Sequence, residues 1–156
     1  MKTTNLILIL MAVMGLMSCG QLHVVTLYVD TTQIDQSSID QHASFGQLSG
    51  IPNNYFTTNV RKGDRIIWQG VSISNPSDTV KITSIDHVSG ARIYAPKSLK
   101  RIKRGIVIKG TDEIVVGTIK IGPGGLEQYI EEKYSLDFTV TNKGTFIIDP
   151  KIRSYK

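Results

Sequence analysis

Most of the chain beyond residue 20 consists of short stretches in which apolar and polar residues alternate, separated by turn-forming residues. A repeat of two residues places alternate side chains on opposite faces of an extended strand, so each stretch predicts a strand. The predicted strands are 22–29, 55–60, 65–72, 79–85, 91–95, 106–108, 114–121, 134–140 and 145–148. Because no long amphipathic helical pattern separates them, the chain predicts an all-β fold, an antiparallel Greek-key sandwich.

Other features refine this prediction. Trp68, the only tryptophan, is expected to fill the core between the two sheets because of its size. Pro150 lacks a backbone N–H, so residues 151–155 are predicted to form an edge strand or a tail. Residues 30–54 are polar and long for a connection. They predict either a functional loop or a loosely packed flank, with one helical turn near 37–42.

The N-terminal residues carry an export pattern. Lys2 precedes an apolar run over residues 5–17, which has the length of a signal peptide and is short for a permanent membrane span. The residues that follow, Leu16-Met17-Ser18-Cys19-Gly20, resemble the lipobox of bacterial lipoproteins. The resemblance implies that Cys19, the only cysteine, becomes a lipidated N-terminus after residues 1–18 are removed. The alternatives are an ordinary secretory signal with an unrelated cysteine, or a buried N-terminal helix.

This pattern divides the chain into a signal peptide at 1–18, a lipidated N-terminus and tether at 19–21, and a single β-sandwich domain at 22–156. The acyl chains on Cys19 would attach the protein to a membrane, and the short tether would keep the domain beside it. No acidic or lysine-containing run follows the cysteine, as it does in surface-exported lipoproteins of some bacterial groups. We therefore expect the cell envelope, at the outer membrane and facing the periplasm.

Composition limits the classes of partner. All four methionines and the cysteine lie within residues 1–19, so the mature domain has no disulfide and depends on packing for its stability. The formal net charge is +5. On an exported protein, this charge favours anionic lipid, an anionic envelope polymer or an acidic protein face over nucleic acid. A solvated surface that is merely basic is the alternative.

The densest positive charge is the predicted partner site. This basic stretch consists of Lys97, Lys100, Arg101, Lys103, Arg104 and Lys109. Near a membrane, each such side chain contributes about 1 kcal/mol of attraction to anionic headgroups. The stretch would equally dock an acidic envelope protein, and an inert loop is the alternative.

Two segments together resemble cupredoxin-like sandwiches. Residues 60–68 (VRKGDRIIW) resemble an early segment of that fold, in which a turn with Gly-Asp leads into a strand that contains a tryptophan. Residues 134–148 resemble its closing hairpin, which contains Gly144-Thr145-Phe146. The domain also resembles small Bacteroidetes lipoproteins, through Gly63-Asp64, Asn75-Pro76-Ser77-Asp78 and Ile148-Asp149-Pro150-Lys151. The resemblance implies a cupredoxin-like or immunoglobulin-like sandwich.

No metal or catalytic set is predicted. A type 1 copper centre needs a thiolate and usually a methionine near the closing strand, where this chain has residues 149–152 (DPKI). His23, His42 and His87 lack the short spacing of zinc ligands. No nucleophile elbow or phosphate loop is present in the sequence. No cofactor and no catalytic residue is therefore expected.

The predicted function is a lipid-anchored, non-catalytic binding or assembly component of the bacterial cell envelope. One alternative is a structural lipoprotein of an envelope complex. Another is a carbohydrate-binding module that uses Tyr55, Tyr94 or Tyr129 as a stacking platform. A metal-dependent enzyme is the last alternative.

Overall fold

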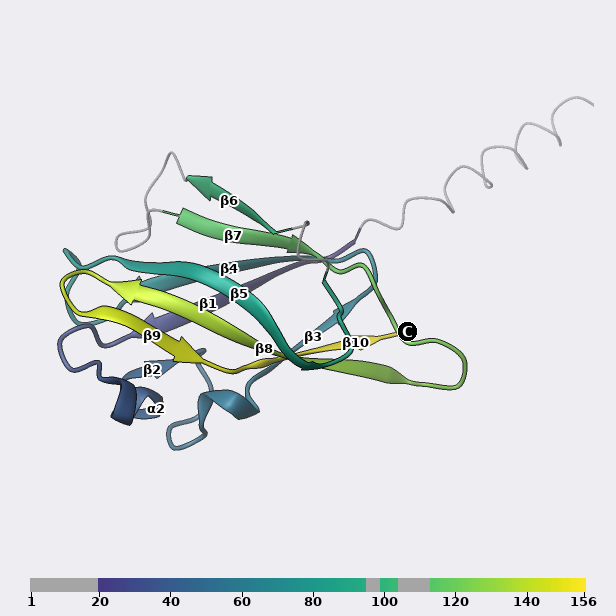
Figure 1. The fold of residues 1–156 in the computed structure, drawn as a ribbon, viewed down its shortest axis with the longest axis horizontal. Coiled ribbons are helices and arrows are strands. Elements are labelled where there is room, and N and C mark those ends of the chain that lie inside the picture. The colour runs from purple at the N-terminus through teal and green to yellow at the C-terminus, as the bar shows by residue number, and fades with distance from the viewer. Residues whose placement is uncertain (1–19, 95–98, 104–112) are drawn as a thin grey trace, which may run out of the picture.

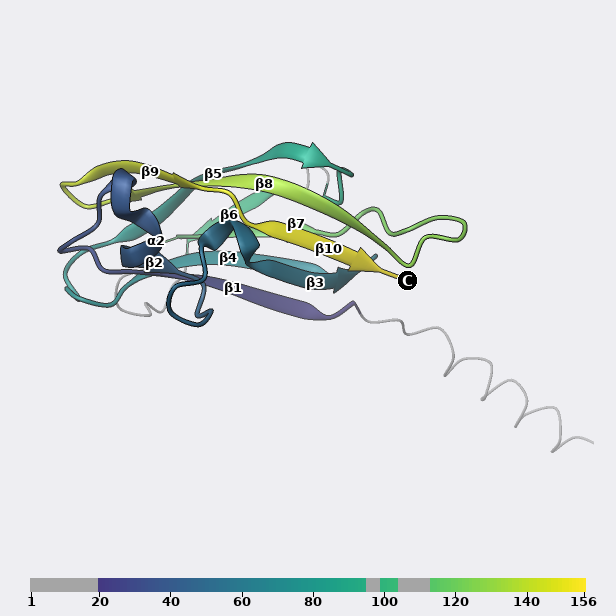
Figure 2. The ribbon, with the colours of Figure 1, turned by 90° about the horizontal axis from the view of Figure 1, so that it is seen from below.

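The computed structural model describes residues 20–94, 99–103 and 113–156, with only the backbone described at 101–103. Within these residues, two five-stranded sheets pack face to face (Figures 1 and 2). The first sheet has the order β2 (Ala43–Ser44), β1 (Leu22–Val29), β4 (Arg65–Ser72), β7 (Glu113–Thr118) and β6 (Lys100–Lys103). The second contains β3 (Thr57–Arg61), β10 (Lys151–Tyr155), β8 (Tyr129–Val140) and β5 (Val80–Gly90), with β9 (Gly144–Ile148) also paired to β8. The predicted β-sandwich is confirmed.

Both sheets are mixed, whereas the sequence pattern predicted antiparallel sheets. Strand β1 runs parallel to β4, and β3 runs parallel to β10. Parallel neighbours need a crossover connection. Between β1 and β4, residues 30–64 provide this crossover. They include β2, the short helices η1 (Gln36–Ser38), α2 (Ile39–His42) and η2 (Asn53–Tyr55), and then β3 in the other sheet. Strands β3 and β4 are consecutive but belong to different sheets, so the turn between them is a corner of the sandwich.

Trp68 lies at the centre of the core, as predicted. It is fully buried, and its ring contacts the rings of Tyr94 and Tyr134 edge-on, at centroid distances of 5.8 and 6.0 Å. Its Nε1 donates a hydrogen bond of 3.0 Å to the hydroxyl of Tyr134, which satisfies both polar groups inside the apolar interior.

The prediction that residues 151–155 form an edge or a tail is wrong. They form β10, which lies between β3 and β8 in the second sheet. Pro150 sits at the break between β9 and β10, which pair in succession with β8. Proline cannot donate a backbone hydrogen bond, and it is tolerated there because the strand ladder is interrupted at this position. Its carbonyl still accepts a hydrogen bond from the backbone N–H of Tyr134.

The long connection over residues 30–54 packs onto the sandwich. Ile34 and Ala43 are buried, and the ring of Phe45 stacks on that of Phe56 at 4.5 Å. The helical turn predicted near 37–42 is present as parts of η1 and α2. This connection is therefore a packed flank of the domain.

The ends of the strands define two ends of the sandwich. The start of β1, the turn from β3 to β4, the end of β10 and the loop before β8 lie together at one end, which we name the proximal end (Figures 1 and 2). The turn from β8 to β9 lies at the opposite end. All described buried apolar side chains lie between Val25 and Ile152, so residues 20–156 contain the whole described core. Among the described residues, no helix is long and apolar enough to cross a membrane.

Candidate functional site

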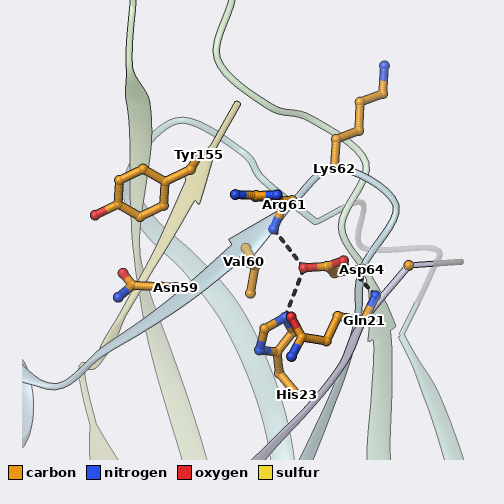
Figure 3. Close-up of a pocket in the computed structure, with 9 residues that line it drawn as sticks. Gln21, His23, Asn59, Val60, Arg61, Lys62, Asp64 and Tyr155 are labelled. Carbon is orange, nitrogen blue, oxygen red and sulfur yellow. Dashed lines mark hydrogen bonds and ion pairs between the residues drawn. The ribbon is translucent and has the colours of Figure 1, made fainter. Parts of the chain in front are cut away.

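Asp64 organises the proximal end. It is the residue directly before β4, and only 6% of its surface is exposed. Its Oδ1 accepts a 2.8 Å hydrogen bond from the backbone N–H of Gln21, and its Oδ2 accepts one of 2.8 Å from the N–H of Arg61. The Nε2 of His23 lies 2.8 Å from the same Oδ2 (Figure 3). One carboxylate therefore joins the N-terminal residues, β1 and the turn between the two sheets.

These contacts keep Asp64 ionised. Burial alone would raise the pKa of its carboxyl, but the hydrogen bonds from His23 and from the backbone N–H groups of Arg61 and Gln21 favour the charged form. The net effect holds the pKa of Asp64 below its ordinary value of 3.8. All three partners are protein groups, which makes the carboxylate a structural anchor and not a free acid or base.

The first described residue is held against the domain. A Cβ atom on Gly20 would collide with the carbonyl oxygen of Gly63, so only glycine allows this approach. The carbonyl of Gln21 also accepts a 2.8 Å hydrogen bond from the backbone N–H of Arg65. The chain is thus fixed to the β3–β4 turn from the residue that follows Cys19.

A pocket of about 560 Å³ lies beside this attachment and is drawn in Figure 3. We name it the N-terminal pocket. It is lined by Gly20, Gln21, His23, Asn59, Val60, Arg61, Lys62, Asp64 and Tyr155. Its floor is polar and already hydrogen-bonded around Asp64, while the side chain of Lys62 points away from it (Figure 3).

A second hollow of about 540 Å³ shares one wall with this pocket. We name it the basic groove. Its lining residues are Arg61, Lys62, Lys120, Ile121, Gly122, Pro123, Tyr155 and Lys156. Four of these eight residues are cationic, and all four are exposed. None of the four makes an ion pair with another described residue.

Hydrogen bonds from the backbone and from one side chain hold the three segments of the basic groove together. In the β3–β4 turn, the N–H of Gly63 donates to the carbonyl of Ile119 at 3.0 Å, and the N–H of Ile119 donates to the carbonyl of Asp64 at 2.9 Å. The Nζ of Lys156 donates to the carbonyl of Gly125 at 2.6 Å. Residues far apart in the sequence therefore form one surface.

The positively charged side chains of β10, which lie just beyond the groove, pair with an acidic side chain. Arg153 donates to Glu131 Oε2 at 2.8 Å, and Lys151 lies 3.4 Å from the other oxygen of the same carboxylate. These charges help to lower the pKa of Glu131, against the effect of its partial burial. Arg153 also lies over the ring of Tyr129, 4.6 Å from its centroid. Acidic side chains therefore pair with the cations of β10, whereas no described acidic side chain forms an ion pair with the four cations that line the basic groove.

A second buried carboxylate belongs to the core. Glu132 is 1% exposed, with Oε1 2.7 Å from Nδ1 of His87 and Oε2 accepting from the N–H of Ile93 at 2.6 Å. Burial raises the pKa of the nearby Tyr94 hydroxyl, and the charge of Glu132 raises it further. His87 is therefore a structural partner of Glu132.

His23 and His87 contact separate carboxylates, Asp64 and Glu132, and the described residues contain no group of three or more His, Cys, Asp and Glu side chains placed to hold a metal. Tyr94 is 3% exposed and contacts Trp68, so it cannot form a surface stacking platform. Tyr55 and Tyr129 are exposed, and Tyr129 contacts Tyr155 at a centroid distance of 5.7 Å.

The basic stretch predicted from the sequence is only partly described. Lys97, Arg104, Lys109 and the lipidation residue Cys19 lie outside the described residues, as do the side chains of Arg101 and Lys103. The backbone of 100–103 forms β6, the last strand in the order of the first sheet, and Lys100 is exposed there. This stretch therefore stays a prediction.

Sequence reasoning missed the basic groove. It treated Arg61 and Lys62 only as part of a turn, and it assigned no role to Lys120 or Lys156. These cations come from three segments, so no local run of charge marks them. The local signal was the pair of adjacent cations, Arg61 and Lys62, in the predicted turn at 61–64.

Comparison with known proteins supports the fold. No known protein-family model and no curated protein sequence matches the chain. Among solved structures, the chain is similar to the crystal structure of the inclusion body protein PixA from Burkholderia cenocepacia. The two are 14% identical, with a TM-score of 0.57 over 89% of this chain and 98% of that one. At this identity, the similarity shows a shared β-sandwich fold.

Proposed function

We propose that the protein is a lipid-anchored, non-catalytic binding or assembly component of the bacterial cell envelope, attached through Cys19. The observation that carries the proposal is the position of Gly20, which is packed against Gly63 at the proximal end. A lipid on the preceding residue would start at the surface of the folded domain, with no flexible linker between them. This arrangement agrees with the short tether expected from the lipobox-like residues 16–20.

The polar interior supports a binding role over a catalytic one. Asp64 and Glu132, the two most buried carboxylates in the part of the chain that the structure describes, are each held by at least two protein groups. A general acid or base must instead keep hydrogen-bonding capacity for a substrate. The partner that we propose is an envelope protein or an anionic envelope polymer, bound through exposed positive charge. Nucleic acid is not proposed as a partner.

Lipidation is tested in cells that express the full chain and grow with a labelled fatty-acid analogue. The wild-type protein should carry the label and fractionate with membranes, and the Cys19→Ser variant should lose both properties. Ser18→Ala is the matched control, because it keeps a small residue before the cysteine and should be labelled normally. An unlabelled wild-type protein, or a Cys19→Ser variant that fractionates unchanged, would overturn the proposal.

Partner binding is tested by crosslinking in the native envelope. Replacing Lys100, Arg101, Lys103 and Arg104 by glutamine should remove crosslinked partners without changing the thermal unfolding temperature. Unchanged crosslinks would eliminate the basic stretch as the partner site and leave the basic groove for the same test.

A further inference from the structure

We infer that the basic groove and the loop beside it form a membrane-docking surface that recognises the headgroups of anionic phospholipids. The inference deepens the proposed function, and it rests on that function only for the choice of a membrane as the occupant. Its structural basis is the convergence of four cations without an ion pair to a described residue and two exposed apolar side chains, at the end where the chain enters the domain.

The cations provide the electrostatic part of this surface. Arg61 and Lys62 lie in the β3–β4 turn, Lys120 follows β7, and Lys156 follows β10. Four like charges around one hollow raise the local positive potential, and no described acidic side chain forms an ion pair with any of them. A phosphate headgroup would supply the missing negative charge.

The loop from residue 120 to 128 provides the apolar part. Leu126 is fully exposed and Ile121 is 49% exposed. The loop projects beyond the C-terminal strand at the proximal end (Figures 1 and 2). Apolar side chains on a projecting loop, next to cations, match the surface by which peripheral proteins lie in the interfacial region of a bilayer. The negative charge of Glu127 on the same loop would be repelled by anionic headgroups, so its removal should strengthen binding.

The position of the N-terminal residues selects a bilayer over an acidic protein. Gly20 and Gln21 line the N-terminal pocket, which shares Arg61 and Lys62 with the basic groove. Cys19 is one peptide bond from Gly20, so its Cα lies about 3.8 Å from that of Gly20. A lipid on Cys19 would therefore attach the domain to a membrane next to this face.

The experiment uses residues 20–156, which contain the whole described core and lack Cys19. The probes are vesicles of pure phosphatidylcholine and vesicles of an equimolar mixture of phosphatidylcholine and phosphatidylglycerol. The domain should sediment with the mixed vesicles and not with the pure ones, and high salt should weaken this binding.

Two matched lysines locate the binding surface. Lys62 and Lys143 are both exposed and both precede a glycine with positive φ in a turn, but Lys143 lies at the opposite end of the sandwich. Lys62→Glu should reduce the partition coefficient on mixed vesicles by roughly tenfold or more, since each interfacial lysine contributes about fivefold and the new charge is repelled. Lys143→Glu makes the same change in net charge and should have a much smaller effect.

Three further variants test the loop. Leu126→Ser should weaken binding, whereas Leu48→Ser, at another highly exposed leucine on the 30–54 flank, should not. Glu127→Gln should strengthen binding. Thermal unfolding verifies that each variant is folded.

The inference is overturned if the domain does not bind mixed vesicles. It is also overturned if Lys62→Glu and Lys143→Glu weaken binding equally, because attraction would then depend on net charge alone. If the domain binds a soluble acidic protein and does not bind vesicles, the occupant of this surface is a protein and not a bilayer. Because the tested domain has no Cys19, none of these outcomes depends on whether the full chain is acylated in cells.

Discussion

Replacing Asp64 by asparagine tests the central contact of the proximal end. The substitution keeps the shape of the side chain but turns one acceptor oxygen into an NH₂ group. In the native protein, Oδ1 accepts from the N–H of Gln21 and Oδ2 accepts from the N–H of Arg61. In either orientation of the amide, one of these two backbone N–H groups therefore loses its acceptor.

The expected cost follows from these hydrogen bonds. A buried donor without a partner costs about 1–3 kcal/mol, and the remaining bond loses the strength that the charge of the carboxylate provides. His23 can adapt by changing its tautomer. We expect Asp64→Asn to lower the free energy of unfolding by about 2–3 kcal/mol, which corresponds to a fall in Tm of roughly 8 °C for a domain of this size.

The assay is urea unfolding followed by fluorescence, because Trp68 is the only tryptophan and is fully buried. Asp86→Asn is the control, since Asp86 is exposed on β5 and its replacement should change stability by less than about 0.5 kcal/mol. Equal stability of Asp64→Asn and the wild-type protein at neutral pH would refute the role assigned to Asp64.

The pH dependence gives an independent measurement. The pKa of Asp64 in the folded protein lies below its ordinary value of 3.8, so the unfolded chain binds more protons in the acid range. The stabilisation from the Asp64 charge is complete above pH 3.8 and is lost as the pH falls through the folded pKa. The stability difference between wild type and Asp64→Asn should therefore shrink below pH 3.8, and a constant difference would contradict this explanation.

Two further predictions concern the core. Gly70→Ala would place a Cβ 2.8 Å from the carbonyl oxygen of Val80 in the facing sheet. We expect it to lower the free energy of unfolding, measured in urea, by about 2 kcal/mol. An unchanged urea midpoint would show that the two sheets move apart at this point at little cost. Glu132→Ala should cost about 3 kcal/mol, because it leaves the N–H of Ile93 without an acceptor and opens a cavity beside His87. Glu132→Gln should cost only about 1 kcal/mol, since its carbonyl can still accept from Ile93, and a reversed order of the two variants would disprove this assignment.

Local patterns in the sequence predicted several strands correctly but not all of them, and they did not predict the arrangement. Residues 91–94 of the predicted strand 91–95 contain only an isolated bridge from Tyr94 to Ile119, and β6 was not predicted. The alternation and the turn residues located 65–72 with the bounds of β4, and the size of Trp68 placed it correctly in the core. In 79–85, a register irregularity between Ile82 and Ser84 turns Ile85 inward, where strict alternation had put it on the face opposite Val80. A bulge of this kind depends on the partner strand and leaves no local signal.

The sequence by itself determined the strand content, the core tryptophan and the lipobox-like pattern at 16–20, because each depends on residues that are neighbours in the chain. Only the tertiary structure decided the parallel pairing of β1 with β4 and the formation of the basic groove. Hydrogen bonds between Ile119 and the β3–β4 turn bring Lys62 and Lys120 to one surface. Such convergence depends on contacts between distant segments, so it becomes visible only when the two sheets are packed together.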